Sequence, residues 1–178
     1  MYIYKIATLD DLNEIIAMKN DVKKKVIEEN LPIWQNGYPQ DELIKEDIEN
    51  DFGRIIVVDN EIVSFATYHP ASYEYDNGTF PCDDVMSFGR VMTKVNKTKH
   101  GYASILIDEM IKETKEKGYP GLGILVDSFN KKALSIYIKH GFRYLKTSPF
   151  PWAVLDVYYL DFDNEWKVKT CKRKNSNN

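Results

Sequence analysis

The chain has 178 residues, of which 43% are hydrophobic, 29% charged and 13% aromatic, and these proportions predict one compact domain with a sizeable core. Its formal net charge of −3 and pI of about 5.7 argue against nucleic-acid binding, which needs a clearly basic face. No apolar run approaches the ~20 residues that cross a bilayer, so no membrane partner is expected.

The cysteines and the N-terminus bear on the cellular compartment. Only Cys82 and Cys171 are present, nearly half the chain apart. The opening segment MYIYKIATLDD lacks the basic-then-apolar pattern of a secretory signal. A reducing compartment without a structural disulfide is the simpler interpretation, and we expect a cytoplasmic protein.

The first third of the chain predicts a strand followed by two helices. Residues 2–6 alternate in character like a half-buried strand, and Thr8 with Asp11 three residues later predicts an N-cap that opens a helix. Residues 30–39 (NLPIWQNGYP) are rich in turn formers, and residues 40–51 are typical of a short acidic helix. The first helix is expected to bury five apolar side chains: Leu12, Ile15, Ile16, Val22 and Val26.

The middle of the chain predicts a β-hairpin, and then a strand followed by a helix. Strands at 54–58 and 62–68 are joined at 59–61 (DNE), a tight-turn composition. Residues 70–83 form a polar connector with little periodicity, and residues 85–93 predict the next strand. One face of the following helix collects residues at helical spacing: Ala103, Leu106, Ile107, Met110, Ile111 and Thr114.

The last part predicts a buried strand, a helix and two final strands. Gly118 is expected to end the preceding helix, and residues 122–126 are almost wholly apolar, as in a strand buried on both faces. Residues 130–140 predict a helix that ends at Gly141. The final strands are expected on either side of the SPFPW segment, at 142–147 and 153–162.

These elements predict an α/β fold with a mixed sheet of about seven strands, in the order β-α-α-β-β-β-α-β-α-β-β, with helices on both faces. Strand-helix-strand units require parallel pairing, whereas hairpins require antiparallel pairing. One domain is expected over residues 1–162, and the polar, lysine-rich residues 163–178 are expected to form a disordered tail.

A candidate anion-binding loop lies at residues 98–103 (TKHGYA). Gly101 lies where a helix begins, so exposed backbone N–H groups are expected to converge there, with Lys97, Lys99 and His100 adding positive charge nearby. The pyrophosphate of a nucleotide cofactor would fit this arrangement. Taken alone, the glycine is more simply an ordinary helix start with solvated lysines.

Three separated motifs together resemble the GNAT superfamily of acetyl-CoA-dependent N-acetyltransferases. The family signature Gln/Arg-x-x-Gly-x-Gly/Ala, between the fourth strand and the third helix, is similar to Thr98-Lys-His-Gly101-Tyr-Ala103, although Thr98 lacks the long side chain. Residues 90–93 (RVMT) are similar to the strand that pairs with the pantetheine arm. The pattern N-x-x-A-x-x-x-Y-x-x-x-G-F at 130–142 is similar to the helix beside the thioester.

The resemblance implies acetyl-CoA as co-substrate, no metal, and a set of site residues. Tyr137 would give a proton to the leaving CoA sulfur, with a core aromatic at helical spacing as the plain alternative. Asn130 would contact the cofactor arm, cap its helix, or do both. The other cofactor-binding residues implied are Val91, Met92, Thr93, Thr98, Lys99, His100, Gly101, Tyr102, Ala103 and Ser104.

The chemistry of acyl transfer leaves the general base open. An alkylamine has a pKa of about 10.4, so the acceptor must lose a proton before it attacks. Asp84, His69 and a water-relayed path are the alternatives. A backbone N–H near residues 91–93 could stabilise the oxyanion.

The WQNGYP segment (34–39) is similar to one in some uncharacterised family members, where it would lie on the acceptor side. Four aromatic residues could line an acceptor pocket or simply fill the core: Trp34, Tyr38, Tyr73 and Tyr75.

The leading hypothesis is an N-acetyltransferase that transfers the acetyl group of acetyl-CoA to an amine of a small molecule or peptide by direct attack on the thioester. A non-catalytic acyl-CoA-binding or regulatory module is the alternative, and an α/β interaction protein without a ligand is a third reading. The expected partner is the amine acceptor, with neither nucleic acid nor membrane, and the protein is expected to be a monomer or homodimer.

Overall fold

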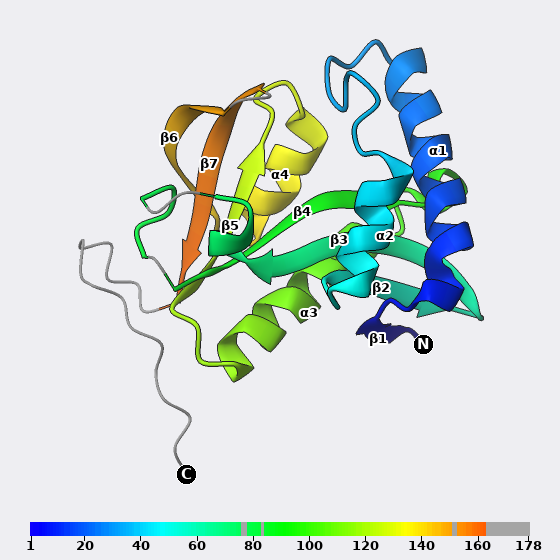
Figure 1. Ribbon diagram of the computed structural model, residues 1–178, viewed down its shortest axis with the longest axis horizontal. Coiled ribbons are helices and arrows are strands. Elements are labelled where there is room, and N and C mark those ends of the chain that lie inside the picture. Colours follow the sequence, from blue (N-terminus) through cyan, green and yellow to red (C-terminus); the bar gives the residue numbers. More distant parts are fainter. Residues whose placement is uncertain (76–77, 83, 151–152, 163–178) are drawn as a thin grey trace. The chain divides into compact units, whose positions relative to one another are not determined.

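The computed structural model contains seven strands and four α-helices within its described residues, which are 1–75, 78–82, 84–150 and 153–162 (Figure 1). The strands are hydrogen-bonded in the order β1-β2-β3-β4-β5-β7-β6. Strands and helices follow one another along the chain as predicted, so the expected α/β fold with a mixed sheet is confirmed. The tail predicted at 163–178 lies outside the described residues.

The elements, in chain order, are β1 (Ile3–Ile6), α1 (Leu12–Glu28), α2 (Asp41–Glu49), β2 (Gly53–Val58), β3 (Glu61–Pro70), β4 (Met86–Thr93), α3 (Tyr102–Glu116), β5 (Gly121–Val126), α4 (Lys131–Lys139), β6 (Arg143–Phe150) and β7 (Ala153–Asp161). Short 3₁₀ turns occur at Leu9–Asp11, Ala71–Tyr73 and Val95–Lys97. In the part of the chain that is described, no helix is long and apolar enough to cross a membrane.

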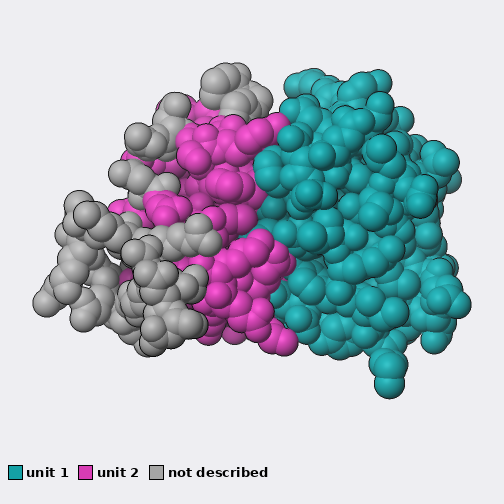
Figure 2. All heavy atoms as spheres, turned by 60° about the horizontal axis from the view of Figure 1, so that its bottom comes forward, with its two compact units in different colours: residues 1–68, 89–109 teal, residues 69–88, 110–178 magenta. Residues whose placement is uncertain are grey.

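The chain forms two compact units, each with its own core (Figure 2). Unit 1 comprises residues 1–68 and 89–109, and unit 2 comprises residues 69–88 and 110–178. Strand β4 crosses from unit 2 into unit 1 after Phe88, and helix α3 returns to unit 2 after residue 109.

The predicted hairpin of unit 1 is present as β2 and β3. These strands pair antiparallel, with Val58 opposite Glu61 at the turn. The turn residues Asp59 and Asn60 have φ values of 50° and 62°, and positive φ at both positions is what a two-residue type I′ turn requires. Strand β1 adds to the other side of β2, also antiparallel.

Helices α1 and α2 supply the apolar side chains that pack on this hairpin. Ile15 and Met18 from α1 and Ile44 and Ile48 from α2 are buried in one cluster with Phe65 of β3. Because an α-helix has about 3.6 residues per turn, the apolar residues of each segment lie on one side of the helix. Burial of this side on the hairpin favours the helical conformation of both segments.

The buried face of α1 differs in part from the predicted one. Ile15 and Val26 are buried as expected, but Leu12, Ile16 and Val22 are only half-buried, whereas Met18 and Lys19 are buried. Lys19 escaped prediction because lysine is rarely buried without a partner. Its ammonium group forms an ion pair with Asp41, at the start of α2.

The strands of unit 2 combine both pairing directions. Strand β5 runs parallel to β4 over three residue pairs, from Met86–Leu122 to Phe88–Ile124, as expected when a helix connects two neighbouring strands. Strand β7 pairs antiparallel with β5, and β6 with β7 (Figure 1). Strand β4 continues five residues past its last pair with β5, to Thr93.

Strand β6 is longer than predicted. It extends to Phe150, through Ser148 and Pro149, which the sequence placed in a separating segment. Proline has no N–H to donate, but β6 is the last strand of the sheet, and an edge strand tolerates a missing donor on its outer side. Residues 151–152 of that segment lie outside the described residues.

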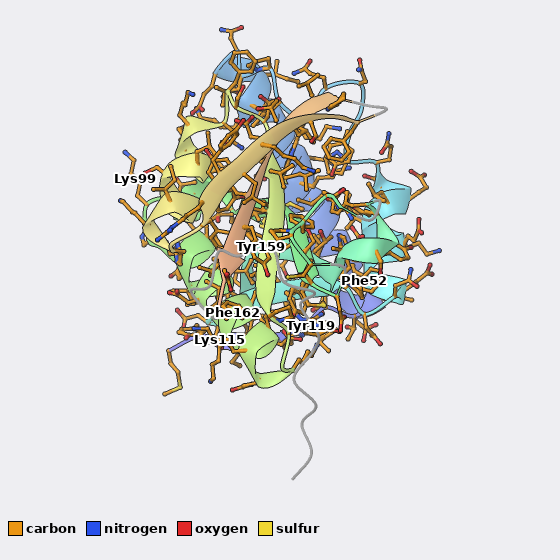
Figure 3. The ribbon with its side chains drawn as sticks, turned by 90° about the vertical axis from the view of Figure 1, so that its left-hand side faces the viewer. Phe52, Lys99, Lys115, Tyr119, Tyr159 and Phe162 are labelled. Atoms are coloured by element: carbon orange, nitrogen blue, oxygen red, sulfur yellow. The ribbon has the colours of Figure 1, made fainter. Side chains whose placement is uncertain are left out.

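The core of unit 2 is rich in aromatic residues. A Cβ added to Gly123 of β5 would lie 2.2 Å from the Phe80 ring, so only glycine fits under it. Phe80 in turn packs beside Tyr159 of β7, at 6.3 Å between ring centroids. Figure 3 shows Lys115 of α3 beside Phe162, with its Nζ 5.1 Å from the ring centroid.

The cysteine expectation is corrected by the structure. Cys82, whose Sγ lies 3.6 Å from the Tyr159 hydroxyl, is disulfide-bonded, whereas we expected no structural disulfide. Its cysteine counterpart in the sequence, Cys171, lies outside the described residues. The cysteines therefore no longer support a reducing compartment.

Candidate functional site

Strand β4 contains a residue in an unusual backbone conformation, in the segment that resembles a pantetheine-binding strand. Arg90 has a φ of 51°, in the left-handed region that a side chain with a Cβ seldom adopts. Such a conformation costs roughly 1–3 kcal/mol and persists only where surrounding contacts hold it. It directly precedes Val91, Met92 and Thr93, the predicted cofactor-binding residues of this strand.

The contact that holds Arg90 is a buried ion pair with Asp47 of α2. Its Nε and Nη2 atoms each donate to one carboxylate oxygen at 2.8 Å, and the side chains are only 4% and 2% exposed. A bidentate pair of this kind satisfies both planar groups, which is the condition for burying two charges without a large penalty. The guanidinium also donates from Nη1 to the Tyr38 hydroxyl at 3.1 Å.

The three residues after Arg90 offer mainly their backbone. The Met92 side chain is buried in the core of unit 1, and its carbonyl oxygen accepts a hydrogen bond from the Ser64 hydroxyl at 2.8 Å. Ser64 Oγ is also 3.3 Å from Thr93 Oγ1. Val91 is half-buried. Side-chain recognition by Met92 is thus excluded, and a ligand could use only backbone groups at this position.

The predicted anion loop is exposed and contains two left-handed residues. Lys99 and Gly101 have φ values of 69° and 81°, and Thr98, Lys99, His100 and Gly101 are all exposed. A Cβ added to Gly101 meets no atom within 4 Å, so the space beside it is open. Successive turns of this kind aim backbone N–H groups into a concave surface that suits anions.

Helix α3 begins directly after this loop. Its first hydrogen bond joins the Ile105 N–H to the Gly101 carbonyl oxygen at 3.0 Å. The N–H groups of Tyr102, Ala103 and Ser104 precede that bond and are the donors that a helix N-terminus leaves for an outside acceptor. The predicted residues Thr98 to Ser104 are thus brought together as one backbone surface within unit 1.

Side chains stiffen the loop rather than extend into it. The Thr98 hydroxyl donates to the Val95 carbonyl oxygen at 3.1 Å, which uses the hydroxyl group that replaces the family's long side chain. The His100 ring stacks on Tyr102, with 5.8 Å between centroids and 5° between planes. His100 Nδ1 lies 3.0 Å from the Thr98 carbonyl oxygen.

The lysines before the loop are held by acidic side chains. Glu61 contacts Lys94 Nζ at 2.8 Å with one oxygen and Lys97 Nζ at 3.2 Å with the other. Hydrogen bonds from Lys94 and then Lys97 lower the pKa of Glu61, and the Glu61 hydrogen bond raises the pKa of Lys94. Lys94 also contacts Glu14 at 3.3 Å. Much of the local positive charge is therefore already balanced.

Asn130 caps helix α4 in unit 2. Its side-chain oxygen accepts a hydrogen bond from the Ala133 N–H at 3.2 Å, so the predicted N-cap is confirmed. This leaves the side-chain NH₂ group as the part of Asn130 that could contact a cofactor.

Tyr137 lies one helical turn beyond Ala133 and is buried in a cluster of aromatic rings. Its ring meets Phe88 edge-on, at 5.5 Å and 85°, and lies 6.1 Å from Phe142. Burial raises the pKa of the Tyr137 phenol well above its ordinary value, so the hydroxyl keeps its proton at neutral pH. Tyr137 therefore packs in the core, as one of the two interpretations predicted, and it also carries a protonated hydroxyl.

The two side chains considered as the base differ in environment. Asp84 is exposed, whereas His69 is fully buried. His69 Nδ1 lies 2.9 Å from the Pro70 carbonyl oxygen, which can only accept, and its Nε2 lies 3.5 Å from Glu74. The rings of Tyr73 and Tyr75 lie beside it at 5.9 and 6.0 Å. His69 is therefore part of a packed polar cluster in unit 2.

The pair between Arg90 and Asp47 was missed in the sequence. The available signals were a charged residue inside an apolar strand and an aspartate between Ile44 and Ile48, on the apolar face of α2. Each indicates a buried charge, and a buried charge requires a partner. Within the described residues, no group of three or more His, Cys, Asp or Glu side chains could hold a metal ion.

Comparisons with known proteins agree with this fold. A profile described as the acetyltransferase (GNAT) family matches residues 22–142. No curated protein sequence matches the chain. A GNAT-family acetyltransferase from Streptococcus agalactiae 2603 superposes with a TM-score of 0.76 at 18% identity, covering 90% of this chain and 95% of that chain.

Two further solved structures carry more specific names. The PaiA N-acetyltransferase of Thermoplasma acidophilum, solved in complex with coenzyme A, has a TM-score of 0.69 at 16% identity, covering 91% of this chain and 99% of that chain. The ribosomal-protein-alanine N-acetyltransferase of Brucella melitensis has a TM-score of 0.63 at 22% identity, covering 88% and 96%.

The mixed sheet with its α3 loop defines an acetyltransferase-like α/β fold. The match over residues 22–142 shows that the chain belongs to the GNAT acetyltransferase family, and the protein is an acyltransferase of this type. The resemblance drawn from the sequence motifs is confirmed.

Proposed function

We propose that this protein transfers the acetyl group of acetyl-CoA to the amine of a small molecule or peptide, by direct attack of the amine on the thioester. The observation that carries the proposal is the run of backbone N–H groups from Thr98 to Ser104, where the exposed, left-handed residues Lys99 and Gly101 precede the N-terminus of α3. This surface suits the pyrophosphate of CoA because it offers several N–H donors and the positive end of a helix.

In this proposal strand β4 holds the pantetheine arm and the acyl group through its backbone. Residues 91–93 follow the last pair of β4 with β5, and because the Met92 side chain is buried, Met92 offers only main-chain groups for binding. A backbone N–H in this segment would stabilise the oxyanion of the tetrahedral intermediate. The geometry thus calls for no special side chain at the oxyanion.

Tyr137 is the proposed hydrogen-bond donor to the leaving CoA sulfur. Burial raises the pKa of this phenol, so it keeps its proton through the neutral range and would act by donating a hydrogen bond to the thiolate. Asn130 would donate a hydrogen bond from its NH₂ group to the cofactor arm while its oxygen caps α4.

The acceptor is proposed to approach the segment 34–39, as the resemblance to other family members implies. A peptide acceptor is one of the two classes, and the Brucella melitensis relative is named for such a substrate.

Cofactor binding is tested by the variant Gly101→Val. A valine would place a branched side chain in the open space beside Gly101 and crowd the pyrophosphate. Gly78→Val is a matched control, because Gly78 has a similar φ of 85° and also has no atom within 4 Å of an added Cβ. Calorimetry should show at least roughly tenfold weaker acetyl-CoA binding for Gly101→Val alone. Equal affinities in two folded variants would refute the placement.

Turnover is tested by the release of CoA thiol with a panel of small amines and peptides. Tyr137→Phe removes only the hydroxyl, and kcat should fall by roughly 10²-fold or more while the affinity for acetyl-CoA stays near that of the wild type. Tyr144→Phe, which loses an exposed hydroxyl 2.9 Å from Thr147, serves as the control. An unchanged kcat would remove Tyr137 from the mechanism. Binding without release for any amine would favour the non-catalytic acyl-CoA-binding module.

A further inference from the structure

The loop between α1 and α2 contains one residue in a strained conformation. Within residues 31–40, Trp34, Asn36 and Gly37 have φ values of 54°, 55° and 83°. Glycine and asparagine adopt positive φ readily, but it is unfavourable for tryptophan, so fixed contacts are needed to keep Trp34 in this conformation.

Three kinds of contact supply this restraint. Lys23 of α1 donates to the Gly37 carbonyl oxygen at 2.6 Å, and the Gln35 side chain donates to the Ile33 carbonyl oxygen at 3.0 Å. Trp34 packs on the core of unit 1. The Tyr38 hydroxyl accepts from Arg90 Nη1, which joins the loop to strand β4 by a hydrogen bond.

Arg90 joins the two strained segments through one rigid group. Its guanidinium is planar and is fixed by Asp47 at 2.8 Å through two of its nitrogens, so the third nitrogen has little freedom of direction. The same residue holds the left-handed turn that aims the backbone of residues 91–93. A shift of Tyr38 would thus displace the Arg90 side chain, and a change in the backbone of β4 at Arg90 would displace the loop.

We propose that Arg90 is a positioning residue that couples the loop 31–40 to the acyl-binding backbone of β4. The inference rests on the proposed function, in which residues 91–93 hold the acyl group and the loop borders the acceptor. Asp47 fixes the guanidinium, and Tyr38 accepts a hydrogen bond from its Nη1. The arrangement keeps the amine-binding and thioester-binding parts of unit 1 in one geometry, which is the condition for a productive attack distance.

The coupling predicts that Tyr38→Phe loosens the loop and weakens its response to the cofactor. The variant keeps the ring and removes the hydroxyl that accepts from Arg90 Nη1. Hydrogen–deuterium exchange of peptides covering residues 31–40 should become roughly tenfold faster than in the wild type, the effect of losing one hydrogen bond to a charged group. Acetyl-CoA should slow this exchange in the wild type and have a clearly smaller effect in Tyr38→Phe.

Tyr2→Phe is the matched control in the same unit. It also deletes a phenol hydrogen bond to a charged side chain, from Tyr2 to Glu109 at 2.7 Å, and should leave exchange in residues 31–40 unchanged. If residues 31–40 exchange hydrogen for deuterium at the same rate in Tyr38→Phe and Tyr2→Phe, the coupling is overturned. The comparison in ligand-free protein stands even if acetyl-CoA does not bind, so it separates a failure of the coupling from a failure of the proposed function.

A kinetic comparison adds a readout that a purely structural role would not move. With an amine that the thiol-release panel finds active, Tyr38→Phe should lower kcat/KM for the amine by roughly tenfold while the Kd for acetyl-CoA stays within about twofold of the wild type. An unchanged kcat/KM together with unchanged exchange would overturn the proposal. Asp47→Asn, which keeps the shape of the carboxylate but not its charge, should raise loop exchange in the same way.

Discussion

At the scale of single residues, Arg90 connects the most consequential groups of unit 1. It adopts a left-handed conformation inside a strand, pairs with Asp47 and contacts Tyr38. In the sequence, Arg90 is notable only as the first residue of the RVMT segment (90–93). Its partners could not be read from local patterns, because Asp47 lies 43 positions away and Tyr38 lies 52 positions away. Pairings over such separations are decided by the packing of α2 and the loop, which periodicity does not describe.

The first residue-scale prediction concerns the stability of this pair. Asp47→Ala should lower the free energy of unfolding by about 3–5 kcal/mol, since it leaves a buried guanidinium without its counter-ion. Glu49→Ala on the same helix is the control. Glu49 faces Lys45 at 3.5 Å on the exposed side, and its loss should cost about 0.3–0.5 kcal/mol. Urea denaturation of both variants measures the difference, and similar values would show that the buried pair contributes little.

The second residue-scale prediction concerns alkaline pH. The pKa of Tyr137 is raised in the folded protein, so the folded state holds the phenol proton more tightly than the unfolded state, where the pKa is about 10. This contribution to stability is fully present below pH ~10 and is lost as the pH rises through the folded-state pKa. Denaturation midpoints measured at successive pH values above ~10, where only the unfolded state loses the phenol proton, should fall less steeply for Tyr137→Phe than for the control Tyr144→Phe. Parallel curves would contradict the burial of the phenol.

At the scale of elements, the sequence predicted the seven strands and four α-helices of the described chain in the right order. The signals were strong where a local pattern decides the structure. Asp59 and Asn60 specify the hairpin turn, and Gly118, with a φ of 74°, ends α3 as expected. The sequence failed where tertiary context decides. Strand β6 continues through Pro149 because it lies at the sheet edge, and Lys19 is buried because Asp41 reaches it.

A prediction at this scale separates the two roles of Asn130 in helix α4. Asn130→Ala should destabilise the protein by about 1 kcal/mol through loss of the cap. Asn130→Asp keeps an oxygen for the Ala133 N–H and should restore most of that stability. If the NH₂ group also binds the cofactor arm, the aspartate variant should remain several-fold weaker in acetyl-CoA binding by calorimetry. Wild-type affinity in a stable aspartate variant would leave Asn130 with the cap alone.

At the scale of the whole molecule, net charge opposes the proposed cofactor. The chain carries a formal charge of −3, and CoA is itself anionic, so long-range attraction must come from local cations near the α3 loop. Lys99 is exposed there and is labelled on the left in Figure 3. Lys94 and Lys97 are nearby in the chain, but Glu61 contacts both.

The prediction for the whole molecule is kinetic. Lys99→Ala should slow the association of acetyl-CoA several-fold in stopped-flow measurements at low ionic strength, and added salt should reduce the difference. Lys45→Ala, which changes the net charge equally on helix α2, should have a much smaller effect. If the two variants associate at the same rate, total charge rather than the local field governs the encounter.

The position of Glu61 at the start of β3 has a further consequence for this encounter. By balancing Lys94 and Lys97 it reduces the electrostatic steering of an anion toward the loop, so the encounter is slower than the number of lysines suggests. A neutral residue at this position would leave Lys97 without this contact, while Lys94 would keep its contact with Glu14. We therefore expect the hairpin turn between β2 and β3, which is remote in sequence from the α3 loop, to influence the rate at which the proposed cofactor binds.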